Sequence, residues 1–247
     1  LRTRRQRQMC IRDRFSDDPQ KFLGKKYDVK NYEKLSDIVE VWFDSGSTHS
    51  FVLEKRSDLK WPASMYLEGS DQHRGWFHSS LLESCGTRGR APFESILSHG
   101  FVVDGKGLKM SKSLGNVIAP QDILKKYGAD ILRIWVASSN YAEDLRIDYS
   151  ILDQHSESYR KIRNTFRYLL GNLNDNFEEI NLKTIDIQKL PELEQLILHK
   201  IYELNEKFKK YFKDYDFHNL YKELLKFCTV DLSAFYFDIR KDSLYCD

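Results

Sequence analysis

The chain has 247 residues, of which 41% are hydrophobic and 13% aromatic, so it can form a packed core and is not a disordered protein. No apolar run approaches the ~20 residues that a membrane-spanning helix needs. The N-terminus has an arginine cluster with no apolar stretch after it, which excludes a secretory signal peptide. We therefore expect a soluble, intracellular protein.

The charge of the chain is unevenly distributed. The first 14 residues contain six arginines and one aspartate, a charge of +5, which leaves −3 on the other 233 residues because the net charge is +2. The body of the chain therefore carries no overall basic signal for nucleic acid. We expect residues 1–24 to be an Arg-rich leader, disordered or foreign to the native protein, and we favour this over an RNA-binding tail.

The four cysteines are scattered as Cys10, Cys85, Cys228 and Cys246. They form no CxxC pair, and no histidine spacing completes a zinc site, so we predict no metal site in this chain. Isolated thiols of this kind suit a reducing compartment.

Up to about residue 150, short apolar runs alternate with glycine-bearing turns. In chain order, the pattern predicts a strand that ends in a turn over 41–47, a strand over 64–69, a helix over 71–85 and a strand over 95–103. Pro120 and Gly128 then bracket a helix, and another helix begins at Ala129. The strand–helix–strand order predicts a parallel sheet in an α/β domain. The expected buried face of the first helix consists of Trp76, Phe77, Leu81, Leu82 and Cys85.

After residue 150 the apolar residues recur at spacings of three and four. This periodicity predicts three amphipathic helices, over about 159–173, 193–212 and 217–228, that pack as a bundle. One βαβ unit is too little for a complete parallel sheet, and the bundle has no stop signal. We therefore expect a piece of a longer enzyme.

Polar residues follow the 64–69 strand at the edge where open α/β sheets bind ligands. Glu68, Gly69, Asp71 and Gln72 lie there, and Gly69 would let a ligand approach the backbone. The alternative is an ordinary helix N-terminus capped by Ser70 or Asp71. The 99–101 stretch HGF likewise indicates a strand end with a close backbone approach. Taken alone, the 41–47 stretch favours Trp42 as a core aromatic beside a turn aspartate.

The stretch LKMSKSLGN at 108–116 places Lys109 and Lys112 on a loop flanked by glycines. Such ammonium groups suit an anion whose charge grows during a reaction, with phosphoryl oxygens as the obvious candidate. The alternative is a solvated basic loop. Neither the GxxxxGK[ST] nor the GxGxxG pattern is present.

Together these motifs resemble a known family. KMSKS at 109–113 matches the second signature of the class I aminoacyl-tRNA synthetases, and it follows YLEGSDQHRGWF (66–77) and HGFVVDGKG (100–107). With VWFDSGS upstream, the combination closely resembles the isoleucyl-tRNA synthetases from about residue 25 to the end. The resemblance implies a Rossmann-like α/β fold over 25–150, the second half of the catalytic domain, followed by the all-α start of an anticodon-binding domain over 151–247.

The resemblance also implies a role for individual residues. Lys109 and Lys112 would act catalytically on the ATP phosphates, and Ser111, Ser113, His99, Gly100 and Phe101 would contact ATP. Glu68, Gly69, Asp71 and Gln72 would bind the aminoacyl-adenylate, with Trp42 and Trp76 as walls of the isoleucine pocket. The implied partners are ATP with Mg²⁺, isoleucine and tRNA(Ile), and the implied parent is a monomer in the cytoplasm, an organelle being left open.

The His-Ile-Gly-His signature and an editing insertion of that family are missing from this sequence. We therefore expect that the chain alone forms no adenylate at a useful rate. The alternatives are a valyl- or leucyl-tRNA synthetase, another nucleotidylyl transferase, or a nucleotide- or RNA-binding module without catalysis.

Overall fold

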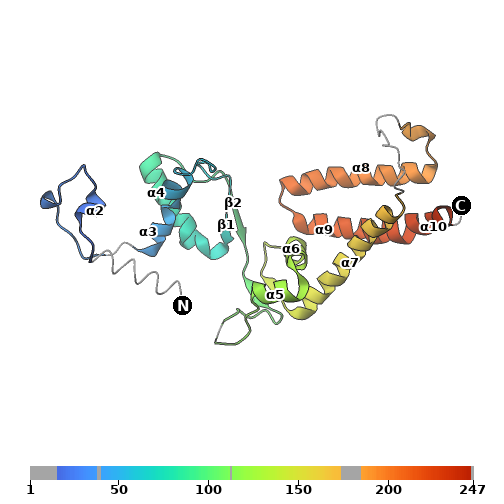
Figure 1. The fold of residues 1–247 in the computed structure, drawn as a ribbon, viewed down its shortest axis with the longest axis horizontal. Coiled ribbons are helices and arrows are strands. Elements are labelled where there is room, and N and C mark those ends of the chain that lie inside the picture. The colour runs from blue at the N-terminus through green and yellow to red at the C-terminus, as the bar shows by residue number, and fades with distance from the viewer. Residues whose placement is uncertain (1–15, 38–39, 112, 174–184, 246–247) are drawn as a thin grey trace. The chain divides into compact units, whose positions relative to one another are not determined.

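In the computed structural model, the described residues are 16–37, 40–111, 113–173 and 185–245. They form two compact units (Figure 1). The first unit contains the described residues up to Pro62 together with Gly75–Pro92, and the second contains Ala63–Arg74 and the chain from Phe93 onward. Within the described residues, no helix has both the length and the apolar character needed to cross a bilayer.

The first unit is helical. Its elements are α2 (Gln20–Leu23), η1 (Val29–Asn31), α3 (Val41–Gly46), η2 (His49–Leu53) and α4 (Trp76–Arg88). The strand predicted over 41–47 is therefore wrong, because these residues form α3. The Glu40 carboxylate caps this helix by accepting from the amide of Trp42 at 2.6 Å. A short apolar run does not by itself distinguish a strand from a helix. Here the Glu40 cap favours the helix.

The predicted buried face of α4 is also largely wrong. Phe77 is buried as expected, but Leu81, Leu82 and Cys85 are exposed, and the other buried positions are Ser80 and Ser84. The reason is that α4 packs closely against α3 at Gly46. A Cβ built on Gly46 would lie 2.9 Å from Ser79 Oγ and 3.0 Å from the Ser80 amide nitrogen. Small residues therefore form this helix contact, and apolar periodicity does not detect them.

The second unit contains two parallel two-stranded sheets. β1 (Tyr66–Gly69) pairs with β2 (Ile96–His99), and β3 (Val102–Asp104) pairs with β4 (Leu145–Ile147). The parallel pairing of β1 with β2 confirms the predicted topology. The single strand predicted over 95–103 is instead two strands, because Gly100 leaves β2 and donates its amide to Tyr141 O at 2.9 Å.

Three helices pack around β4 to form the first hydrophobic core. They are α5 (Pro120–Tyr127), α6 (Ala129–Ser138) and α7 (Tyr149–Gly171). Pro120 opens α5 and Gly128 follows it with φ 83°, as predicted. The buried residues of this core are Ile123, Ile131, Trp135, Leu145, Ile147 and Leu152.

The helical region continues with α8 (Glu192–Lys213), α9 (Phe217–Lys226), the π-helical segment η6 (Phe227–Tyr236) and α10 (Phe237–Tyr245), after a short η5 (Ile187–Lys189). In Figure 1, α8 runs beside α9 and η6, and Ile197, Leu232 and Phe237 form a second core. The fold is thus parallel sheets with helices, followed by a helical region. The predicted stripe on α7 is exposed in part, since Phe166 and Leu170 face solvent.

Candidate active site

The carboxyl ends of β1 and β2 bring together the residues predicted to bind the adenylate. The register pairs Glu68 with Ser98 and Gly69 with His99. The segment η3 (Ser70–Arg74), which holds Asp71 and Gln72, follows directly. A Cβ on Gly69 would lie 2.7 Å from Asp71 Oδ1, so a larger residue where the strand turns into η3 would make the Asp71 side chain move. The expected strand-edge cluster is therefore present.

The Glu68 carboxylate and the His99 ring are neighbours at this edge. Glu68 Oε1 accepts from the Gly69 amide at 3.0 Å and lies 3.9 Å from His99 Nε2, which is beyond hydrogen-bond range. His99 Nδ1 donates to Gly100 O at 2.7 Å, and this fixes the ring. The Glu68 side chain is about half exposed, so it can accept a hydrogen bond from a ligand.

Gly100 and Phe101 form the link between the two sheets. A Cβ on Gly100 would collide with the backbone of Glu143, which confirms the predicted close approach. The Phe101 amide donates to Asp144 Oδ1 at 2.8 Å, and the ring stays partly exposed. The ammonium of Lys109 lies 6.0 Å from the centre of that ring. The second unit thus places a loop lysine next to the residues that follow β2.

The loop after β3 is held by two residues that sequence reasoning missed, Asp104 and Asn116. Asp104 Oδ1 accepts from the amides of Lys106 and Leu108 at 3.0 and 2.8 Å. Asn116 Nδ2 donates to Asp104 Oδ2 at 2.9 Å. The hydrogen bond from Asn116 is the main reason that the pKa of Asp104 lies below its usual value, and the hydrogen bonds from the loop amides lower it further. The Asp-Gly turn and the Gly-Asn pair were the available signals, since both are typical of tight turns.

Met110 attaches the same loop to the protein core. It is half-buried against the cluster around Ile123 and Trp135. Asn116 binds the residues on both sides of Met110. Its Oδ1 accepts from the Ser111 amide at 2.9 Å, and its Nδ2 lies 3.4 Å from Lys109 O. The methionine between the predicted site residues is therefore an anchor.

Ser111 and Ser113 lie on the loop with their hydroxyls 3.1 Å apart. Ser111 Oγ also accepts from the Leu114 amide at 3.2 Å, so it serves the turn. Lys112 lies outside the described residues.

The two predicted pocket tryptophans belong to the first unit. Trp76, at the start of α4, is half-buried, and its indole nitrogen donates to Ser45 O on α3 at 3.0 Å. Trp42, on α3, has an exposed fraction of 43%. It is therefore not the core aromatic of the alternative interpretation.

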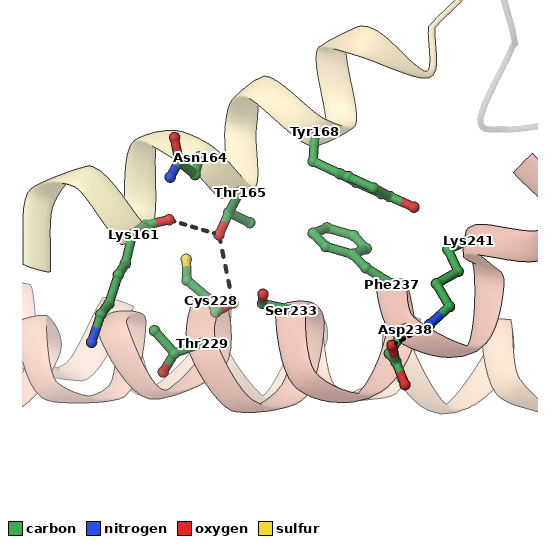
Figure 2. Close-up of a pocket in the computed structure, with 10 residues that line it drawn as sticks. All are labelled: Lys161, Asn164, Thr165, Tyr168, Cys228, Thr229, Ser233, Phe237, Asp238 and Lys241. Atoms are coloured by element: carbon green, nitrogen blue, oxygen red, sulfur yellow. Dashed lines mark hydrogen bonds and ion pairs between the residues drawn. The ribbon is translucent and has the colours of Figure 1, made fainter. Parts of the chain in front are cut away.

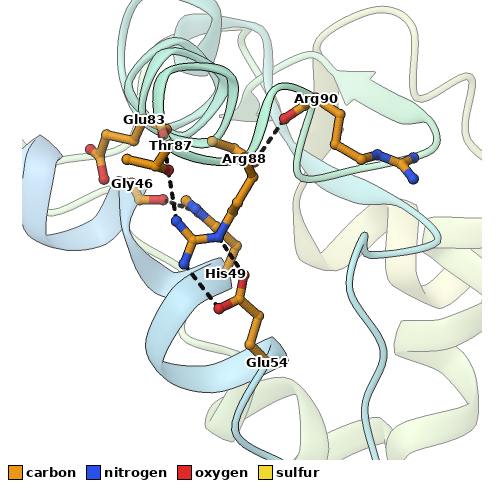
Figure 3. A network of polar contacts seen from close by, with 8 residues as sticks. Gly46, His49, Glu54, Glu83, Thr87, Arg88 and Arg90 are labelled. Carbon is orange, nitrogen blue, oxygen red and sulfur yellow. Dashed lines mark hydrogen bonds and ion pairs between the residues drawn. The ribbon is translucent and has the colours of Figure 1, made fainter.

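A polar network ties η2 and the residues beside it to α4 in the same unit (Figure 3). Arg88 forms an ion pair with Glu54, with Nη2 2.9 Å from Oε2, and this hydrogen bonding lowers the pKa of Glu54. The buried His49 donates Nδ1–H to Gly46 O at 3.0 Å. The pKa of Glu83, beside Gly46, is raised by burial and by Asp44. The network fixes the helix pair that carries both tryptophans.

A hollow of about 640 Å³ lies between α7, η6 and α10 (Figure 2). In Figure 2 Thr165 projects from α7 toward η6, and its single hydroxyl proton is shared between Lys161 O at 3.2 Å and Cys228 O at 3.5 Å. Burial raises the pKa of the Cys228 thiol, which is therefore uncharged at neutral pH. The hollow is bordered by Lys161, Asn164, Thr165, Tyr168, Cys228, Thr229, Ser233, Phe237, Asp238 and Lys241.

The fold agrees with the comparison to known families. Residues 2–148 match the family described as tRNA synthetases class I (I, L, M and V), and residues 194–247 match the anticodon-binding domain of tRNA ligase. The chain belongs to the class I tRNA synthetases.

Its curated relatives point to one member of that class. The chain is 83% identical over 233 residues to the isoleucine–tRNA ligase of Pelagibacter ubique (strain HTCC1062), a match that covers 94% of this chain and 26% of the relative. The isoleucine–tRNA ligase of Mesorhizobium japonicum is 54% identical over 228 residues, or 92% of this chain and 22% of the relative. The chain thus spans about a quarter of the length of these relatives.

Two solved structures share the fold. One is the LeuRS of Agrobacterium radiobacter K84 agnB2 in a ternary complex with tRNA and LeuAMS, with a TM-score of 0.67 at 18% identity over 79% of this chain and 26% of that one. The other is the Mycobacterium tuberculosis methionyl-tRNA synthetase with methionyl-adenylate, with a TM-score of 0.63 at 19% identity over 83% of this chain and 40% of that one. At these identities the likeness shows the fold alone.

Proposed function

We propose that this chain is the segment of an isoleucine–tRNA ligase that supplies the KMSKS half of the ATP site. The observation that carries the proposal is the position of the Lys109 ammonium, 6.0 Å from the Phe101 ring beside the β1–β2 edge. The 83% identity to an isoleucine–tRNA ligase supports the choice of amino acid. In the proposed reaction, the isoleucine carboxylate attacks the α-phosphorus of ATP, and pyrophosphate leaves.

Lys109 and Lys112 would hold the pyrophosphate as its negative charge develops. Preorganised cations stabilise such charge more in the transition state than in the ground state. His99, Gly100, Phe101, Ser111 and Ser113 would complete the ATP contacts. The half-exposed Glu68 with Gly69, Asp71 and Gln72 would hold the adenylate and its ribose at the strand edge.

Trp42 and Trp76 would wall the pocket for the isoleucine side chain. Apolar walls discriminate one methylene weakly. The standard example is the selectivity of this family of enzymes for isoleucine over valine, which is about 150-fold. The hydrogen bond from Trp76 to Ser45 supports a pocket wall of fixed orientation.

The helical region would contact tRNA. The match of residues 194–247 to an anticodon-binding domain supports this assignment. We propose a catalytic part over 25–150 and a helical part over 151–247. The Arg-rich leader predicted over 1–24 overlaps the family match over residues 2–148, and its described part contains α2 (Gln20–Leu23). A monomeric, cytoplasmic parent stays a prediction.

Mg²⁺ would enter with the ATP phosphates. Among the described residues there is no group of three or more His, Cys, Asp or Glu side chains that could hold a metal ion. Asp104, the carboxylate nearest the lysine loop in sequence, accepts from N–H donors on both oxygens. We assign the ion no ligand in this chain.

The proposal is tested with a chimera in which the 233 aligned residues of this chain replace the matching residues of the Pelagibacter ubique isoleucine–tRNA ligase. We expect ATP–pyrophosphate exchange that depends on isoleucine, with kcat/KM within about tenfold of the relative, because the two sequences are 83% identical over the exchanged segment. Exchange that depends on valine or leucine instead would favour a sister synthetase. A folded chimera without exchange would favour a module without catalysis.

A further inference from the structure

The KMSKS loop is joined to strand β3 by a set of hydrogen bonds that centre on two side chains. Asp104 is the last residue of β3, and Asn116 follows the loop twelve residues later. Their mutual bond of 2.9 Å closes the loop at its base. Each side chain also binds backbone groups inside the loop, so the pair does more than join two ends.

Asp104 organises the first half of the loop. Its Oδ1 accepts from the amides of Lys106 and Leu108, and its own amide donates to Leu108 O at 2.9 Å. Gly107 takes φ 82° between those two residues, a left-handed conformation that favours glycine. The chain then returns along β3, where Lys109 forms a bridge with Val103.

Asn116 organises the second half of the loop. Its amide oxygen accepts from Ser111 N at 2.9 Å, and its amide nitrogen reaches Asp104 Oδ2 and, at 3.4 Å, Lys109 O. These groups lie on either side of Met110, whose side chain packs on the core. The backbone of Lys109 is thus held by a strand bridge and a side-chain amide, and the core contact of Met110 holds the next residue.

We propose that Asp104 and Asn116 form a clasp that positions Lys109 for the phosphates of ATP. Both act through the loop backbone and are positioning residues. The inference rests on the proposed function for its ligand, whereas the clasp itself is a property of this chain. A flexible loop lysine has to be ordered at each turnover, and a preformed backbone reduces that cost.

The orientation of the Asn116 amide gives the clasp a specific signature. In Asp104→Asn, two NH₂ groups would face each other, so Asn116 would turn its oxygen to position 104 and leave the Ser111 amide without an acceptor. In Asn116→Asp, two carboxylates would face each other. The double swap Asp104→Asn with Asn116→Asp restores one donor and one acceptor, and it keeps acceptors for the Leu108 and Ser111 amides.

The first arm of the test measures amide hydrogen exchange by NMR in the full 247-residue chain. Each single variant should speed exchange at Ser111 by about tenfold or more, because Asp104→Asn removes the acceptor of that amide and Asn116→Asp makes two carboxylates repel each other and draws residue 116 away from it. The swap should return it to within about threefold of the unchanged chain. Asn205→Asp, the same substitution at an exposed position on α8, is the control and should change nothing at Ser111.

The second arm measures pyrophosphate exchange in the chimera described above. Each single variant should lower kcat or raise the KM for ATP by about tenfold, with the KM for isoleucine changed less than about twofold, and the swap should recover most of this loss. Unchanged Ser111 exchange in both single variants, or a swap that fails to recover in both arms, would overturn the clasp. If the unchanged chimera shows no isoleucine-dependent exchange, the proposed function fails, and the amide measurements alone decide the clasp.

Discussion

At the scale of single residues, Trp76 is the proposed pocket wall whose indole nitrogen makes a hydrogen bond within the first unit. Its indole nitrogen donates to Ser45 O, and Trp76→Phe keeps a ring but loses that hydrogen bond. A bond of this kind contributes about 1 kcal/mol, so the KM for isoleucine in the chimera should rise several-fold while the KM for ATP stays the same. Trp61→Phe is the matched control, because the Trp61 indole nitrogen has no hydrogen-bond partner in the described part of the chain. Equal changes in the two variants would remove Trp76 from the pocket.

Asp104 gives the loop a pH dependence at the residue scale. Because its folded-state pKa is lowered, chiefly by Asn116, its contribution to stability is present above the unfolded-state value and is lost as the pH falls through the folded-state value. The ordinary pKa of aspartate is about 4, and the Leu108 amide resonance should titrate with a midpoint below that value. Asn116→Ala should raise this midpoint. An NMR titration from pH 6 to 3 checks this, and a midpoint that Asn116→Ala leaves unchanged would contradict it.

At the scale of elements, glycine has opposite effects at two positions of the α3–α4 pair. Gly46→Ala would place a Cβ against Ser79 and Ser80 and should lower the free energy of unfolding of the first unit by about 1–3 kcal/mol. Gly86→Ala in α4 meets no atom within 4 Å and should raise that free energy by up to about 1 kcal/mol, because alanine favours the helix. Urea denaturation followed by tryptophan fluorescence measures both. A destabilising Gly86→Ala would show that more than helix propensity acts there.

His155 on α7 makes the packing of the helical region sensitive to pH. Burial lowers the pKa of His155. Its ring lies 6.4 Å from the ring of Tyr221, and its Nδ1 is 3.4 Å from Ser138 Oγ. The backbone carbonyl of Ser138 accepts a hydrogen bond from His218. The unfolded chain therefore binds more protons as the pH falls below about 6.5, so stability should decrease from pH 7 to 5.

His155→Gln should flatten this dependence, whereas His199→Gln at an exposed site should not. Thermal melts at several pH values measure the difference. The same slope in both variants would exclude His155 as the cause.

Local sequence signals predicted some of these elements correctly and missed others. Proline and glycine signals predicted the bounds of α5, and the strand–helix–strand order predicted the parallel pairing of β1 with β2. The sequence pattern missed α3 because a capping Glu40 decides its conformation, and it missed the buried serines of α4 because close packing at Gly46 selects small residues. In the candidate site it predicted the charged and strand-edge residues, but not Asp104 and Asn116, whose bond joins positions twelve residues apart.

At the scale of the whole molecule, this chain spans about a quarter of its curated relatives and has no His-Ile-Gly-His sequence. The 247-residue chain alone should therefore show no isoleucine-dependent pyrophosphate exchange, whereas the chimera should show it. The assay uses equal protein concentrations, and circular dichroism confirms that both proteins are folded. Exchange by the chain alone would show that one half of the ATP site suffices.

The most direct test of the central claim is Lys112→Ala in the chimera, measured by steady-state pyrophosphate exchange. If this lysine stabilises charge on the leaving pyrophosphate, kcat should fall by about 10²–10³, with the KM for isoleucine changed less than about threefold. Lys125→Ala, on the exposed side of α5, is the matched control and should leave both parameters unchanged. Equal losses in kcat and in isoleucine affinity, or no loss in either, would contradict the claim that this loop acts on the transition state.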